Sequence, residues 1–201
     1  MGKAHDAASH AGPAGRDNRE QQTGSNDMTD AAERYKAVDR GLHWIIAALI
    51  IGNLAGGLLH DALEDVINLM PLHKASGMTV LALSLVRIAW RFTWRTPAYP
   101  IGMSGLEVFA AKATHLLFYG LMLAMPVTGW IMASAGKYPL SWFGLFDLPK
   151  LPVTRDSALY GIGHEGHELL GWVMLALVVL HVGAALRHHF VLKDNILRRM
   201  A

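Results

Sequence analysis

HEGHELLGWVMLALVVLHVGAALRHH, residues 164–189, is the part of the chain from which its architecture can be inferred. It is apolar over most of its length, yet it carries five of the eleven histidines in the sequence. Polar rings are costly in lipid, and ionisable residues inside a membrane span mark functional sites by default. The stretch therefore predicts a membrane helix whose histidines carry chemistry.

Three other apolar segments precede this one. The four apolar runs cover residues 41–59, 75–90, 113–135 and 169–186. A bilayer span takes about 20 apolar residues, and these runs reach or approach that length. Each is apolar on all sides rather than on one face, which disfavours a soluble helical core. The sequence thus predicts an all-α protein, an integral membrane four-helix bundle.

The composition narrows the chemistry. The chain is 52% hydrophobic and 17% charged, and it contains no cysteine. This excludes disulfides, thiolate zinc sites, cysteine-bound iron–sulfur clusters and covalent c-type haem. A net charge of +2 without a basic, aromatic-rich cluster argues against a nucleic-acid partner.

The chain divides into two parts of different composition. Residues 1–33 are rich in small, polar and charged side chains, which predicts a disordered cytoplasmic tail. Residues 34–201 contain every apolar segment and are predicted to form one four-span domain.

The charges that flank the segments predict the orientation of the bundle. Eleven cations flank one side: Arg34, Lys36, Arg40, Arg87, Arg91, Arg95, Lys112, Arg187, Lys193, Arg198 and Arg199. Four lie on the other side: Lys74, Lys137, Lys150 and Arg155. The positive-inside rule then places both termini in the cytoplasm. The long outer loop, residues 136–164, is expected to cap the outer face.

The histidines sort by helix geometry. A helix advances about 100° and about 1.5 Å per residue, so His167 and His181 share a face and lie about 21 Å apart. Span direction places His43 in the inner leaflet with His181, and His73 in the outer leaflet with His167. Two imidazoles that face each other across a flat cofactor are the arrangement of bis-histidine haem ligation. The sequence therefore predicts one haem site in each leaflet.

Residue size supports the same four histidines. A porphyrin lies against the helix beside its axial ligand, so the residue four positions later should be small. Ala47, Gly77, Gly171 and Ala185 follow His43, His73, His167 and His181 at this spacing. Other metal chemistry fits less well: HEGHE lacks the spacing of a zinc protease motif, and Glu165 and Glu168 lie at the rim, where a di-iron site cannot use them.

Four motifs resemble those of the bacterial cytochrome b561 family. They are DRGLHW, LHKASG, HLLFYGLMLAMPVTG and GHELLGWVMLALVVLHVGAALRHHFVLKDNILRRM. The similarity runs from about Tyr35 to Met200, and the closing ALRHHFVLKDNILRRM is its most specific part. The chain resembles the diheme members described as superoxide oxidases more than the cytochrome subunits of hydrogenases or formate dehydrogenases.

This resemblance implies two haems b in a multi-pass protein of the bacterial inner membrane, ligated by His43 with His181 and by His73 with His167. It also implies ubiquinone as a partner and superoxide as the electron donor at the periplasmic face. Lys74 and Lys137 are then expected to steer the superoxide anion. His188, Arg187, Arg40 and His115 are candidates for binding the quinone or supporting the inner haem. Two other functions stay open: a quinol-oxidising module with a separate redox partner, and an anchoring cytochrome subunit of a larger dehydrogenase or hydrogenase.

Overall fold

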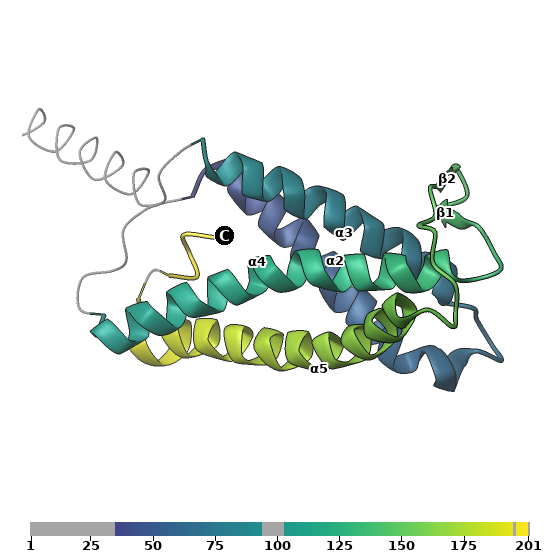
Figure 1. The fold of residues 1–201 in the computed structure, drawn as a ribbon. Coiled ribbons are helices and arrows are strands. Elements are labelled where there is room, and N and C mark those ends of the chain that lie inside the picture. Colours follow the sequence, from purple (N-terminus) through teal and green to yellow (C-terminus); the bar gives the residue numbers. More distant parts are fainter. Residues whose placement is uncertain (1–34, 94–102, 195, 201) are drawn as a thin grey trace, which may run out of the picture. The chain divides into compact units, whose positions relative to one another are not determined.

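The computed structural model describes residues 35–93, 103–194 and 196–200. Four long helices run side by side in this part of the chain (Figure 1): α2 (Ala37–Leu63), α3 (Met70–Arg91), α4 (Gly105–Ser134) and α5 (Ala158–Arg187). Helix α2 packs on α3, α3 on α4, and α4 on α5. The predicted tail, residues 1–33, lies outside the described residues.

The two ends of this helix group differ. We call one the hairpin end, because it carries the antiparallel strands β1 (Leu140–Trp142) and β2 (Phe146–Leu148) (Figure 1). We call the other the terminal end. There the backbone N–H of Tyr35 donates to the carbonyl of Arg199 at 3.2 Å, and α5 continues into the π-helical turn η1 (His188–Leu192). The first and the last described residues of the chain therefore both lie at the terminal end.

The helices are longer than the apolar segments because capped polar residues extend them. Ser104 and Glu107 form a reciprocal capping box at the start of α4. The hydroxyl of Ser157 accepts from the backbone N–H of Tyr160 at 3.3 Å and starts α5. The expected loop 136–164 is therefore too long: it ends at Ser157, and residues 158–164 are helical. The remaining loop does cover α3, where the indole N–H of Trp142 donates to the Thr79 hydroxyl at 3.0 Å.

The buried core lies between the two depths at which the histidines occur. Its members come from all four helices: Ile46, Ile50, Val80, Leu121, Met122, Met174 and Leu177. Ile46 and Ile50 follow His43 along α2, and Met174 and Leu177 lie between His167 and His181 on α5. An apolar layer therefore separates the two histidine levels.

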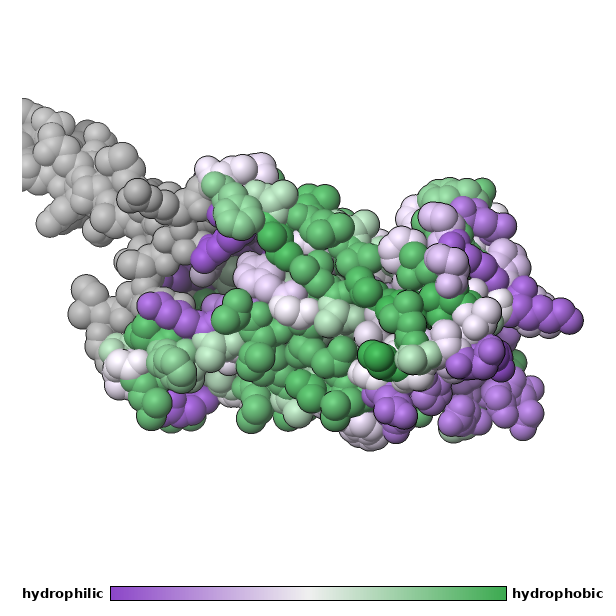
Figure 2. Space-filling model, viewed as in Figure 1, coloured by the Kyte–Doolittle hydropathy of each residue, from purple (hydrophilic) through white to green (hydrophobic). Residues whose placement is uncertain are grey.

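The outward surface of the helices is also apolar. Leu116 is 73% exposed and Leu180 is 68% exposed, although both lie mid-helix, and Figure 2 shows hydrophobic side chains over the middle of the molecule. Lipid, rather than water, satisfies such a surface. Three helices are long and apolar enough to cross a membrane: α2, α4, and α5 with η1. The described chain is that of a helical membrane protein.

Helices α4 and α5 approach closely at Gly163, which yields a stability prediction. A Cβ atom at Gly163 would lie 2.8 Å from Cγ2 of Ile131, whose β-branched side chain is stiff in a helix. We expect Gly163→Ala to destabilise the protein by about 1–3 kcal/mol through overpacking. Thermal unfolding in detergent measures this, with Gly161→Ala as the control because nothing lies within 4 Å of its Cβ position. Equal unfolding temperatures for the two variants would contradict the prediction.

Candidate functional site

The four helices repeat one spacing. Each carries two residues fourteen positions apart that meet the histidine levels: His43 and Gly57, His73 and Arg87, His115 and Gly129, His167 and His181. Fourteen helical residues return to within about 40° of the same face and rise about 21 Å. The first level, at the terminal end, thus takes one residue from every helix, and so does the second level, at the hairpin end.

The hairpin-end level brings His73 and His167 together. Their ring centroids are 6.1 Å apart and their planes cross at 76°. Glycines on the neighbouring helices make room for both rings: a Cβ at Gly57 would lie 3.5 Å from Cε1 of His73, and a Cβ at Gly129 would lie 3.1 Å from Cε1 of His167. The two glycines allow α2 and α4 to pack directly against the imidazoles.

The hydrogen bonds of His167 define its tautomer. Its Nδ1 lies 3.1 Å from the carbonyl oxygen of Met125 and 3.1 Å from the hydroxyl of Thr128. A carbonyl only accepts, so Nδ1 carries the proton and Nε2 keeps a free lone pair. Metal-bound histidines typically donate their second ring N–H in this way. His167 is therefore prepared to bind a metal through Nε2.

A polar contact between α2 and α3 lies one helical turn from His73. The buried hydroxyl of Ser76 donates to Oδ1 of Asn53 at 2.6 Å. Gly77 faces the same amide, since a Cβ there would lie 3.5 Å from Nδ2 of Asn53. This contact joins the two helices one turn from His73.

The terminal-end level gathers three imidazoles. The ring of His181 lies 6.4 Å from that of His43, with planes at 68°, and 6.3 Å from that of His115, with planes at 64°. His43 and His181 are half-buried, whereas His115 is exposed. The indole of Trp44, next to His43, donates to the carbonyl of Met200 at 2.6 Å. The predicted pair is close, and His115, which was predicted to bind the quinone or support the inner haem, is a second neighbour of His181.

Both predicted pairs have the separation that bis-histidine ligation needs. Two metal–imidazole bonds of about 2 Å each and two ring radii of about 1.1 Å place the centroids of two such ligands about 6 Å apart. The observed values are 6.4 Å and 6.1 Å. The residues present therefore fit a haem iron at each level.

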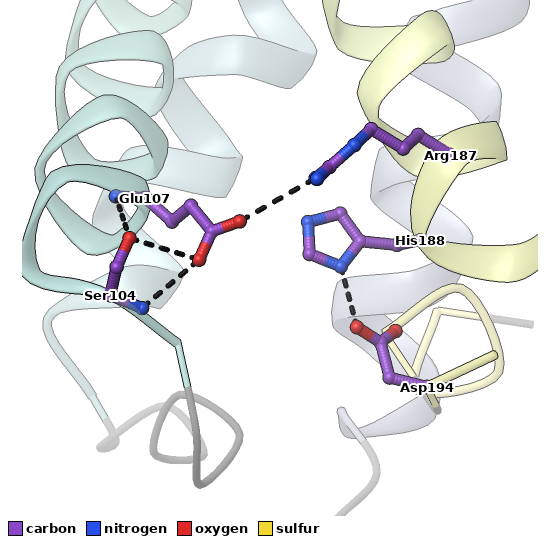
Figure 3. Close-up of polar contacts among 5 residues, drawn as sticks. All are labelled: Ser104, Glu107, Arg187, His188 and Asp194. Atoms are coloured by element: carbon purple, nitrogen blue, oxygen red, sulfur yellow. Dashed lines mark hydrogen bonds and ion pairs between the residues drawn. The ribbon is translucent and has the colours of Figure 1, made fainter. Parts of the chain in front are cut away.

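The predicted quinone candidates Arg187 and His188 each meet a carboxylate (Figure 3). Arg187 pairs with Glu107 of α4 at 3.5 Å, and Nδ1 of His188 lies 2.5 Å from Asp194. Arg40 lies about one turn before His43 on α2. All of these residues are at the terminal end, close to the first histidine level. Sequence reasoning missed Glu107 and Asp194, which no spacing rule connects to α5.

The predicted steering cations lie at the hairpin end. Lys74 follows His73 on α3 and is half-buried, and Lys137 is exposed just beyond α4. Lys150 comes near enough to Lys74 to repel it electrostatically, and its ammonium donates to the carbonyl of Gly136 at 2.6 Å. Lys74, Lys137 and Lys150 thus lie at the same end of the protein as the second histidine level, and we call them the cationic rim.

Three other histidines of the described chain make no ring contact with the paired imidazoles. The ring of His164 lies tilted at 6.0 Å from that of Tyr160, and the ring of His189 lies edge-on at 4.7 Å from that of Phe190. His60 lies in the last turn of α2, close to Asp61 and Glu64. The metal-ligating atoms of these three residues lie within 4.8 Å of one another. Asp61 and Glu64 are exposed to solvent.

Comparison with known proteins gives a consistent result. Residues 34–201 match the model of a protein family described as prokaryotic cytochrome b561. The chain is 32% identical to cytochrome b561 homolog 2 of Escherichia coli, over 86% of this chain and 94% of the relative. It is 27% identical to the probable superoxide oxidase CybB of Yersinia pestis, over 84% of this chain and 96% of the relative. A cytochrome b562 of Cereibacter sphaeroides is 29% identical over 83% of this chain and 94% of the relative.

Proposed function

Because this chain belongs to the prokaryotic cytochrome b561 family, and is a bacterial membrane protein that binds b-type haem and transfers electrons, we propose that it carries electrons from superoxide to ubiquinone through two haems. One observation carries the proposal: two histidine pairs of ligand-like separation lie at opposite ends of an apolar interior. The relative named as a probable superoxide oxidase supports the choice of donor.

The proposed axial ligands are His73 with His167 and His43 with His181. His43 is preferred over His115 as the partner of His181 because it is half-buried, whereas His115 is exposed. When bound, the two haems supply one-electron carriers on either side of the apolar layer. The protein holds the imidazoles in place, excludes water with the layer around Ile46 and Leu177, and fixes the proton of His167 on Nδ1.

The proposed orientation places the hairpin end in the periplasm and both termini in the cytoplasm, with α3 as the fourth span of a domain covering residues 34–201. The cation distribution in the loops supports it. The protein is then a multi-pass component of the inner membrane, and residues 1–33 form its cytoplasmic tail.

Each end of the protein has a chemical task. At the hairpin end, Lys74 and Lys137 attract superoxide, and two superoxide anions give up one electron each and leave as dioxygen. At the terminal end, ubiquinone accepts the two electrons and two cytoplasmic protons to become ubiquinol. We assign Arg40, Arg187 and His188 as the hydrogen-bond donors to the quinone carbonyls, with His115 beside His181 as a supporting residue.

Superoxide-driven reduction of ubiquinone by the purified protein tests the proposal. We expect quinol to form at half the rate of superoxide loss. The rate should fall as ionic strength rises, because screening weakens the attraction of the cationic rim. Lys74→Gln should slow the reaction at low salt and converge with the unmodified protein at high salt. Absence of quinol formation by a haem-loaded preparation would overturn the proposal.

Substitution of His188 tests the quinone side separately. Asp194 accepts from Nδ1 of His188, and Nε2 can donate to a quinone carbonyl when both ring nitrogens carry a proton. We expect His188→Ala to reduce the rate of quinone reduction about 10-fold or more, since general acid–base groups contribute about 10²–10⁴. The absorption spectra of both haems should stay unchanged, and His189→Ala serves as the matched control. Loss of a haem from His188→Ala would instead make His188 part of the ligand set.

A further inference from the structure

The two histidine levels differ in charge. At the level of His43 and His181, α3 contributes Arg87, whereas at the other level α3 contributes His73. The half-buried Arg87 acts electrostatically on His43, on His115 and on His181. Among the described residues it makes no ion pair: the nearby buried carboxylate, Asp39, accepts from the indole of Trp90 at 3.2 Å instead. A full positive charge therefore stands beside the terminal-end pair.

The hairpin-end level differs in the hydrogen bonds that its histidine ligand makes. The Nδ1 proton of His167 is shared between the Met125 carbonyl and the Thr128 hydroxyl, and that hydroxyl in turn donates to the same carbonyl at 2.8 Å. Such acceptors raise the basicity of a metal-bound imidazole. No hydrogen bond reaches a ring nitrogen of His43 or His181 within the described part of the chain. Lys74, next to His73, acts electrostatically on that ring but not on His167, and it also lies near Lys150.

Both differences make the reduction potential of the terminal-end haem higher than that of the hairpin-end haem. A nearby cation favours the reduced haem, which carries one positive charge less than the oxidised haem, and so raises the potential. A more basic imidazole favours the oxidised iron and so lowers the potential. Arg87 acts on both ligands of the terminal-end pair, and the hairpin-end pair contains the more basic ligand, His167.

We propose that Arg87 and the Met125–Thr128 acceptor pair set unequal reduction potentials at the two haems, with the higher potential at the terminal end. This inference rests on the proposed function. It assigns the direction of electron flow: an electron that enters at the hairpin end moves downhill towards His43 and His181. The same gradient opposes the onward transfer of an electron from the terminal end to the hairpin end, which disfavours the quinol-oxidising alternative. Arg87 and Thr128 are positioning residues for this reaction, since they act through the ligands.

Potentiometric titration of the haem absorption bands tests the inference without any assay of activity. The unmodified protein should show two separate midpoint potentials. Arg87→Gln should lower the higher potential, changing the oxidised-to-reduced ratio of that haem about 10-fold, which corresponds to about 59 mV for one electron. Arg87→Lys, which keeps the charge, should restore most of the separation. Thr128→Val should raise the lower potential, and Thr128→Ser should restore it.

The outcomes separate this inference from the function on which it rests. A preparation with one haem per chain would overturn the proposed function. Two haems with coinciding potentials in the unmodified protein would overturn only the gradient, and so would an Arg87→Gln variant in which neither potential moves or the lower one falls. If Arg87→Gln fails to accumulate, Thr128→Val decides: a lower potential that does not rise also overturns the inference.

Discussion

His181→Ala is expected to lose one haem entirely and to keep the other, so that the haem content falls from two per chain to one. His181 is the ring shared by both close imidazole contacts of the terminal-end level, at 6.4 Å and 6.3 Å. Without it both ring contacts of ligand-like separation at this level are lost. The pyridine haemochrome assay on purified protein measures the ratio.

Two further variants identify the second ligand at this level. If His43 completes the pair, His43→Ala should give the same loss as His181→Ala, and His115→Ala should keep both haems. The reverse pattern would transfer the ligand role to His115 and leave the two-haem arrangement intact. Retention of both haems by His181→Ala would sink the assignment of this level as a haem site.

Gly129→Val should empty the hairpin-end site while the terminal-end site stays loaded. Even the Cβ of alanine at this position would lie 3.1 Å from Cε1 and 3.4 Å from Nδ1 of His167. The branched side chain of valine fills the space of the ring itself, so the imidazole must turn away and lose its bond to Met125. We expect about one haem per chain, and Gly129→Ala should lie between this variant and the unmodified protein.

Gly120→Val is the matched control, because Gly120 is on the same helix and nothing lies within 4 Å of its Cβ position. Both substitutions carry the same propensity penalty for valine in a helix, so a difference between them measures contact with His167. Equal haem content in the two variants would refute a role of Gly129 in seating the ring.

Much of the architecture follows from local patterns in the sequence. The apolar segments predicted the four helices, although polar caps at Ser104 and Ser157 extend α4 and α5 beyond them. The predicted outer loop was wrong at its end, because Ser157 starts α5 before the apolar run begins. A cap acts through one side chain, which an average over many apolar residues does not register.

The candidate site, like the fold, is partly predictable from local sequence patterns and partly dependent on how the helices pack. The depth and face of His73, His167, His43 and His181 follow from helix periodicity, and the rings that the sequence paired lie 6.1 Å and 6.4 Å apart. The position of His115 beside His181 depends on how α4 packs on α5, which periodicity within one helix does not contain. The repeated spacing of fourteen residues was the available signal for Gly57, Gly129 and Arg87, since each lies fourteen positions after a histidine.

By itself, then, the sequence predicted the four apolar helices, the two levels of histidines along them and the family, because apolar length, the helical period and short motifs are properties of consecutive residues. Only the tertiary structure decided which glycines touch the rings, which oxygens hold the proton of His167, and which carboxylates meet Arg187 and His188. Most of these contacts join residues far apart in the chain, from Met125 to His167 and from Glu107 to Arg187, whereas Asp194 meets His188 through the turn that follows α5. Their distances depend on how closely the helices pack and where each helix ends.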